Sequence, residues 1–168
     1  MVDGSVLPVV EAVAEVFAEL IRMDDPRLMD RLYYANSIFY DAANMDEAAQ
    51  PAYVPEMQKA NRVYAQIIEA SPTTQDPYYN RARLNRYIPG EEAKTAELFQ
   101  QFIEVTMAKG DSEVAKPLTQ TKLADAYTSL GAWYSDIDRE KAIFMFEKAL
   151  GYEPGNEHVV QSLKFLKK

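Results

Sequence analysis

The amino-acid sequence predicts an all-α protein built from repeated helical hairpins, and three observations support this prediction. An aromatic residue followed by apolar residues three and four positions later occurs in three aligned segments, and this spacing makes one stripe along a helix. A small residue precedes each of these aromatic residues in another helix-like run. The pairs are Ala35 and Tyr64, Ala82 and Phe99, and Gly131 and Phe146. No segment of useful length alternates apolar and polar residues as a β-strand would.

The last hairpin carries the most specific pattern. It runs Tyr127-x2-Leu130-Gly131-x2-Tyr134, then Ala142-x3-Phe146, then Pro154. Gly131 leaves room where the two helices meet, Phe146 fills that room, and Pro154 ends the hairpin because it has no N–H to donate. The pattern resembles the tetratricopeptide repeat (TPR), with Tyr127 where tryptophan is usual. The resemblance implies a TPR-like helix-hairpin solenoid, which is a right-handed superhelix with N- and C-terminal capping helices. It also implies that the protein binds peptides or proteins, because such repeats rarely perform chemistry.

The first hairpin contains an insertion. Tyr64 follows Ala35 by 29 residues, whereas the corresponding separations in the second and third pairs are 17 and 15 residues. Residues 44–55 hold the extra length, and their polar start and two prolines, Pro51 and Pro55, predict a long loop between the helices. Two interpretations remain open, namely a solvated connector and a loop that folds over one end of the binding surface.

The repeats predict a single TPR-like domain over residues 1–168. Its parts are an N-terminal helix at 5–23, a first repeat with the insertion at 26–72, a second repeat at 76–110, a third repeat at 112–154 and a capping helix at 156–168. The N-terminal helix matches the second helix of a repeat whose first helix is missing. We therefore expect either a fragment of a larger protein or a dedicated end cap, and a second copy could bury the apolar side of this helix in a dimer.

Caps and prolines predict where the helices begin and end. Ser5 caps the first helix, and Asp25-Pro26 opens the second, which runs to about Ala43. The later helices are expected to start at Pro55, Asp76-Pro77, Glu91, Ser112 or Lys116-Pro117, Asp138 and Asn156. Gly110 is expected to end the fifth helix in a left-handed conformation.

Composition excludes several classes of function. Hydrophobic residues make up 48% of the chain, but no run is long enough to cross a membrane. The N-terminal segment lacks the basic start of a signal peptide. The net charge of −8 disfavours binding to nucleic acid or to an anionic membrane surface. The absence of cysteine excludes disulfides and thiolate metal sites.

The sequence offers few groups for catalysis or metal binding. His158 is the only histidine, and no glycine-rich phosphate or dinucleotide motif occurs. Ser162 lies one turn after His158, but a short terminal helix provides neither a cleft nor oxyanion donors. We therefore predict that the protein is not an enzyme and has no catalytic residue, no cofactor and no metal site.

The first helix of each repeat is the remaining place for a site. In TPR proteins this helix lines the concave groove, and alignment on Ala35, Ala82 and Gly131 assigns the groove residues of this chain. They are Leu32, Tyr33, Asn36 and Phe39 in the first repeat, Tyr79, Asn80, Arg83 and Arg86 in the second, and Asp125, Thr128, Ser129 and Ala132 in the third. The clamp that some TPR proteins use for a peptide carboxylate is incomplete, because Leu32, Asp125 and Ser129 stand where it needs basic residues.

Three arginines, Arg81, Arg83 and Arg86, are close together in an otherwise acidic chain. They either pair with acidic neighbours inside the molecule or contact a carboxylate of a partner, which guanidinium groups bind well. We predict a groove that takes an extended or helical segment of a partner protein. Its residues are Tyr33, Asn36, Tyr79, Asn80, Arg83 and Arg86.

A second hypothesis is a small-ligand or glycan-binding accessory domain of a bacterial envelope protein. Exposed Tyr33, Phe39 and Tyr79 would favour stacking on such a ligand, whereas buried tyrosines beside free arginines would favour a protein partner. The segment Tyr78–Arg83 is also similar to one in exported TPR proteins of gut-type bacteria. This similarity favours the cell envelope or periplasm if a signal peptide was removed, and the cytoplasm otherwise.

Overall fold

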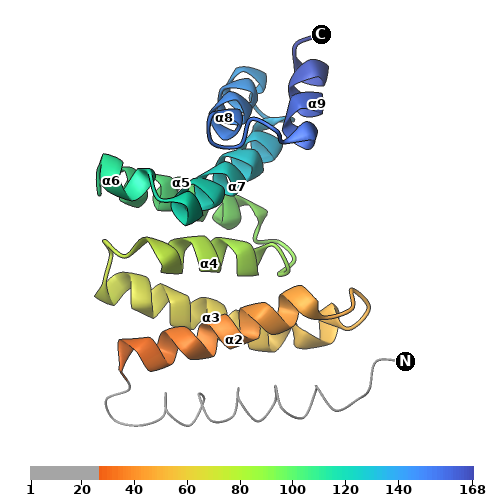
Figure 1. The fold of residues 1–168 in the computed structure, drawn as a ribbon. Coiled ribbons are helices and arrows are strands. Elements are labelled where there is room, and N and C mark those ends of the chain that lie inside the picture. The colour runs from red at the N-terminus through yellow and green to blue at the C-terminus, as the bar shows by residue number, and fades with distance from the viewer. Residues whose placement is uncertain (1–26) are drawn as a thin grey trace. The chain divides into compact units, whose positions relative to one another are not determined.

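The computed structural model describes residues 27–168, which form eight α-helices and no β-strand (Figure 1). The helices are α2 (Leu28–Asn44), α3 (Gln50–Ala70), α4 (Gln75–Asn85), α5 (Glu92–Met107), α6 (Asp111–Val114), α7 (Pro117–Tyr134), α8 (Arg139–Tyr152) and α9 (Glu157–Leu166). The all-α prediction is therefore confirmed for this part of the chain. The helix predicted at 5–23 lies outside the described residues.

The chain divides into two compact units, the first ending at Glu91 and the second beginning at Glu92. Unit 1 contains α2, α3 and α4, and unit 2 contains α5 to α9. The division falls inside the second predicted repeat, between its helices α4 and α5. The single domain and the repeat boundaries at 26–72, 76–110 and 112–154 stay predictions.

In unit 1, α2 and α3 form the first hairpin, and α4 packs against both helices (Figure 1). Ala35 and Tyr64, the small and aromatic residues that the sequence pairs in this hairpin, are both fully buried. Ile38, Phe39 and Met57 pack around them in one apolar core. The sequence pattern therefore identified the inner face of this hairpin correctly.

The insertion in the first hairpin is mostly helical, which corrects the prediction of a long loop. α3 begins at Gln50, so only residues 45–49 connect it to α2, and Pro55 lies inside the helix instead of at its start. Pro51 occupies the first turn of α3, where a missing N–H costs no helical hydrogen bond. Pro51 is thus compatible with the start of a long helix, whereas Pro55 inside the helix cannot donate one of its backbone hydrogen bonds.

Contacts with α2 explain why the inserted residues adopt this helical form. Tyr53 and Val54 pack against the core of unit 1. The Tyr53 hydroxyl also donates a hydrogen bond to Oδ2 of Asp41 on α2, at 3.0 Å. The added turns of α3 therefore lengthen the hairpin.

In unit 2, α7 and α8 form a hairpin, α5 packs against α7, and α9 packs against α8 (Figure 1). Phe146 of α8 is 1% exposed, and its ring lies directly against Gly131 of α7. A Cβ atom added at Gly131 would come within 2.6 Å of that ring. The predicted roles are confirmed, because the missing side chain of Gly131 is what lets Phe146 fill the space between the helices.

Several predicted helix ends are also confirmed. Asp138 and Asn156 each accept a hydrogen bond from the backbone N–H three residues later, at 3.0 Å and 3.2 Å, and so cap α8 and α9. Gly110 has a φ of +87° after α5, the left-handed conformation expected there. The short helix α6 follows, so α7 begins at Pro117, which is one of the two predicted starts.

Candidate functional site

The strongest candidate site lies on α2 and α4 of unit 1, which pack against each other. Tyr33, Asn36 and Tyr40 follow one another at helical spacing on α2, and Asn80 and Arg83 do so on α4. We call these five residues the α2–α4 face. A hydrogen bond from α3 and two buried aromatic rings contact residues of this face and so connect α2 with α4.

Asn36 of α2 forms hydrogen bonds with residues of two other helices. Its Oδ1 accepts hydrogen bonds from the Tyr64 hydroxyl of α3 at 2.6 Å and from Asn80 Nδ2 of α4 at 3.0 Å. These bonds leave the amide nitrogen of Asn36 and the amide oxygen of Asn80 without hydrogen-bond partners among residues 27–168. Both residues are half-buried, so one donor and one acceptor are accessible to another molecule.

Arg83 lies over two aromatic rings. Its guanidinium carbon is 4.6 Å from the centre of the Phe39 ring and 5.5 Å from the centre of the Tyr79 ring. Cation–π contacts of this kind contribute roughly 0.5–2 kcal/mol, depending on how far water is excluded. Within the described part of the chain, no carboxylate pairs with Arg83. The rings therefore hold a guanidinium whose N–H groups can still bind an anion.

Exposure separates the aromatic residues of this region into two groups. Tyr33 and Tyr40 are 51% and 59% exposed, whereas Phe39 and Tyr79 are 1% and 7% exposed. The sequence assigned Phe39 and Tyr79 to the groove surface, but the structure places their rings under Arg83, where they support it. Tyr40 was missed, although its position seven residues after Tyr33, two helical turns along α2, could have revealed it.

Tyr64 connects the core of unit 1 to this face. Its side chain is fully buried, and burial raises its pKa well above the usual value of 10.0. The nearby Tyr40 raises the pKa of Tyr64 further, and the positive charge of Arg83 opposes the shift. The hydroxyl therefore keeps its proton at neutral pH and remains a hydrogen-bond donor to Asn36.

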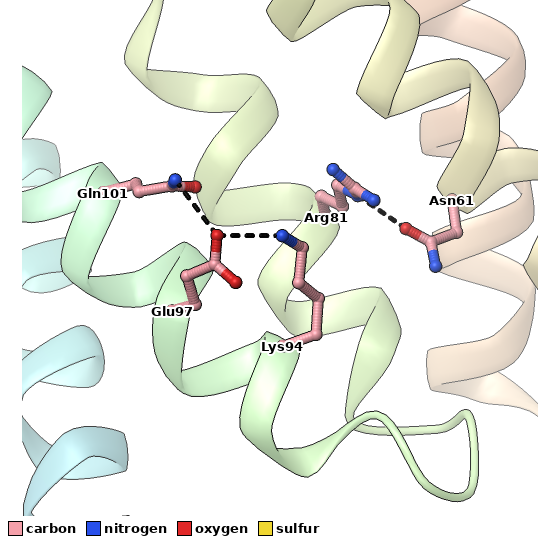
Figure 2. A network of polar contacts seen from close by, with 5 residues as sticks. All are labelled: Asn61, Arg81, Lys94, Glu97 and Gln101. Carbon is pink, nitrogen blue, oxygen red and sulfur yellow. Dashed lines mark hydrogen bonds and ion pairs between the residues drawn. The ribbon is translucent and has the colours of Figure 1, made fainter.

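The other two arginines of the cluster lie in different surroundings. Arg81 Nε donates to Oδ1 of Asn61 at 2.6 Å, which ties α4 to α3 (Figure 2). Arg86 is exposed at the C-terminal end of α4. The interpretation that the arginines connect helices thus applies to Arg81, which bonds to Asn61 of α3.

Hydrogen bonds within single helices occur on α7 and α5 of unit 2. On α7, the Ser129 hydroxyl donates to the backbone oxygen of Asp125 at 2.8 Å. On α5, one carboxylate oxygen of Glu97 accepts hydrogen bonds from Lys94 at 2.9 Å and Gln101 at 3.3 Å (Figure 2). Such bonds stabilise a helix locally. They do not join several helices as the Asn36 bonds do.

The candidate metal ligands and the His158–Ser162 pair do not form a site within residues 27–168. No group of three or more histidine, aspartate or glutamate side chains there could hold a metal ion. His158 is exposed on α9, and the Ser162 hydroxyl donates to its backbone oxygen at 3.0 Å, not to its imidazole. No helix in the described range is long and apolar enough to cross a membrane.

Two solved structures have a fold similar to that of this chain. The crystal structure of MamA protein matches 98% of this chain over 82% of its own length, with a TM-score of 0.53 and 15% identity. The C-terminal part of a TPR repeat-containing protein from Cytophaga hutchinsonii matches 92% of this chain, with a TM-score of 0.57 and 16% identity. This chain spans 60% of that second structure.

At these identities the likeness concerns the fold alone, and it confirms the prediction of a TPR-like helical-hairpin fold. No protein-family model matches the sequence, and no curated protein matches it.

Proposed function

We propose that this protein is a non-enzymatic interaction module whose α2–α4 face binds a segment of a partner protein. The observation that carries the proposal is Arg83, which two rings hold in place and which no carboxylate of residues 27–168 neutralises. A guanidinium fork can bind a carboxylate through two parallel hydrogen bonds. The partner segment therefore contains an aspartate, a glutamate or a free C-terminus.

Asn36 and Asn80 suit recognition of the partner's backbone. The accessible amide nitrogen of Asn36 can donate to a peptide C=O, and the accessible amide oxygen of Asn80 can accept from a peptide N–H. Tyr33 and Tyr40 provide apolar ring surface beside these groups. An extended segment with an acidic residue next to apolar side chains fits all three features.

Glycan or small-ligand binding is the second candidate function. The exposed rings of Tyr33 and Tyr40 favour it, because a ligand could stack on them. The burial of Phe39 and Tyr79 counts against it, since two of the three aromatic residues expected to stack are covered. A protein segment is therefore the better supported ligand. Membership in a larger protein remains part of the proposal, and so does location in the cell envelope or periplasm if a signal peptide was removed and in the cytoplasm otherwise.

Selection from a display library of random peptides tests the proposal without a known partner. The full chain should enrich peptides in which aspartate or glutamate adjoins apolar residues. Asn36→Ala combined with Arg83→Ala should weaken binding of these peptides on the order of tenfold or more, because hydrogen bonds to charged groups contribute about 1.5–3 kcal/mol. Arg62→Ala, which removes an exposed arginine of α3, is the matched control and should bind normally.

Two outcomes would contradict the proposal. The first is that the double variant enriches the same peptides with the same affinity as the wild-type chain. The second is that no peptide is enriched while a glycan array gives binding that Tyr33→Ala and Tyr40→Ala abolish, which would establish the second candidate function instead.

A further inference from the structure

A second surface of unit 1, around Tyr34 of α2, carries positive charge that its own residues do not neutralise. Glu56, Lys59 and Arg62 of α3 lie close enough to Tyr34 for their charges to act on its hydroxyl. Glu56 pairs with Lys59 at 2.5 Å. The charge of Arg62, which is exposed, therefore remains on this surface.

Arg31 adds a second cation one helical turn before Tyr34. Its Nε is buried and has no hydrogen-bond partner among residues 27–168. An arginine stays charged at any physiological pH, so a buried guanidinium Nε–H without an acceptor is unfavourable. Leu28, one further turn back, is 40% exposed. We call Leu28, Arg31, Tyr34 and Arg62 the Arg31 face.

A complementary segment of the same chain directly precedes α2. Residues 1–26 contain six acidic residues and one basic residue, a net charge of −5 out of the −8 of the whole chain. Glu11, Glu15 and Glu19 recur every four residues and share one side of the helix predicted at 5–23. The spacing of Val13, Phe17 and Leu20 predicts an apolar stripe on another side of that helix.

We propose that residues 5–23 dock on the Arg31 face of the same chain. The glutamate stripe supplies carboxylates to Arg31 and Arg62, and the apolar stripe covers Leu28. Charge complementarity favours this occupant, and so does its attachment, because a short connection to α2 gives the segment a high effective concentration at this surface. The segment then acts as an end cap for the first hairpin, a surface separate from the α2–α4 face.

Hydrogen exchange of the full chain tests this docking, since amides of a docked segment exchange slowly. With Arg31→Glu plus Arg62→Glu, amides of residues 5–23 should exchange about five- to tenfold faster than in the wild-type chain. Lys164→Glu plus Lys168→Glu changes the net charge equally at two exposed residues near the C-terminus. This control should leave exchange in residues 5–23 unchanged.

A second set of variants does not depend on how the arginine variant folds. Glu11→Gln, Glu15→Gln and Glu19→Gln together should accelerate exchange by a similar factor, and adding the arginine substitutions should then change little. Equal exchange in all variants would overturn the proposal, as would fully additive effects. Protection that increases with protein concentration would overturn docking within one chain and assign the segment to a second copy.

Discussion

The hairpin of α2 and α3 and the hairpin of α7 and α8 each bury an aromatic residue at the corresponding position, but only the aromatic residue of unit 1 carries a hydroxyl group. In unit 2, the ring of Phe146 packs against Gly131. In unit 1, Tyr64 takes the aromatic position opposite Ala35, and its hydroxyl donates to Asn36 at 2.6 Å. The aromatic residue therefore only fills space in unit 2, whereas in unit 1 it also fixes a surface amide. The comparison shows how a packing position can orient a residue of the proposed binding face.

Loss of the Phe146 ring should have the largest effect on the stability of the protein. Phe146→Ala is expected to destabilise the protein by roughly 3–5 kcal/mol, because it removes a buried ring and leaves a cavity. Urea unfolding followed by the fluorescence of Trp133 on α7, the only tryptophan, measures the change. A loss below about 1 kcal/mol, typical of surface positions, would show that Phe146 is not part of the core.

Exchanging tyrosine and phenylalanine at the two aromatic positions tests the contribution of the hydroxyl group to stability. Phe146→Tyr should cost about 1–3 kcal/mol, because the new hydroxyl enters a buried apolar site. Tyr64→Phe should cost about 0.5–1.5 kcal/mol, because Asn36 loses one hydrogen bond. Urea unfolding of both variants provides the comparison. Equal tolerance of both substitutions would mean that the two hairpins do not differ in the way described.

The close approach at Gly131 should give a smaller net effect. Gly131→Ala places a methyl group within 2.6 Å of the Phe146 ring, a strain of about 1–3 kcal/mol that higher helix propensity offsets by about 1 kcal/mol. Gly151→Ala on α8 is the matched control, because nothing lies within 4 Å of its added Cβ. The control should be neutral or slightly stabilising in thermal unfolding. Equal changes in the midpoint temperature of both variants would contradict the packing role of Gly131.

Alkaline pH should reveal the smallest difference between the hairpins. Burial raises the pKa of Tyr64 above 10.0, so above about pH 10 the unfolded chain loses this proton while the folded chain keeps it. The unfolded state then binds fewer protons, and stability falls as the pH rises. Tyr64→Phe lacks this contribution, so the stability advantage of the wild-type chain over Tyr64→Phe should shrink between about pH 8 and pH 11. A constant difference in denaturant midpoints would exclude the effect.

Features that depend on spacing along a helix could be predicted from the sequence. The pairs of small and aromatic residues identified the inner faces of both hairpins, and side-chain caps identified the starts of α8 and α9. The insertion was predicted wrongly, because Pro51 suits a loop as well as the first turn of a helix, and because α3 continues through Pro55 despite the missing N–H. The contact of Tyr53 with Asp41, which favours the helix, joins residues of different helices and has no signature in the sequence.

The candidate site, too, could be predicted only where it depends on spacing along one helix. Alignment of the repeats placed Asn36, Asn80 and Arg83 together, and these residues do gather on one face of unit 1. Alignment could not show that Tyr79 lies under Arg83, because both residues occupy the same side of α4 and only tertiary packing decides which one is on the outside. The link from Tyr64 to Asn36 spans two helices and was equally hidden.

The most direct test of the α2–α4 face is an NMR titration of the isotope-labelled full chain with an acidic peptide obtained from the display selection. The side-chain amide signals of Asn36 and Asn80 and the Nε signal of Arg83 should shift together and saturate with the peptide. Arg83→Ala should abolish the shifts of the two asparagines. A peptide that binds with equal affinity while these signals stay in place and signals of unit 2 move would contradict the proposed binding face.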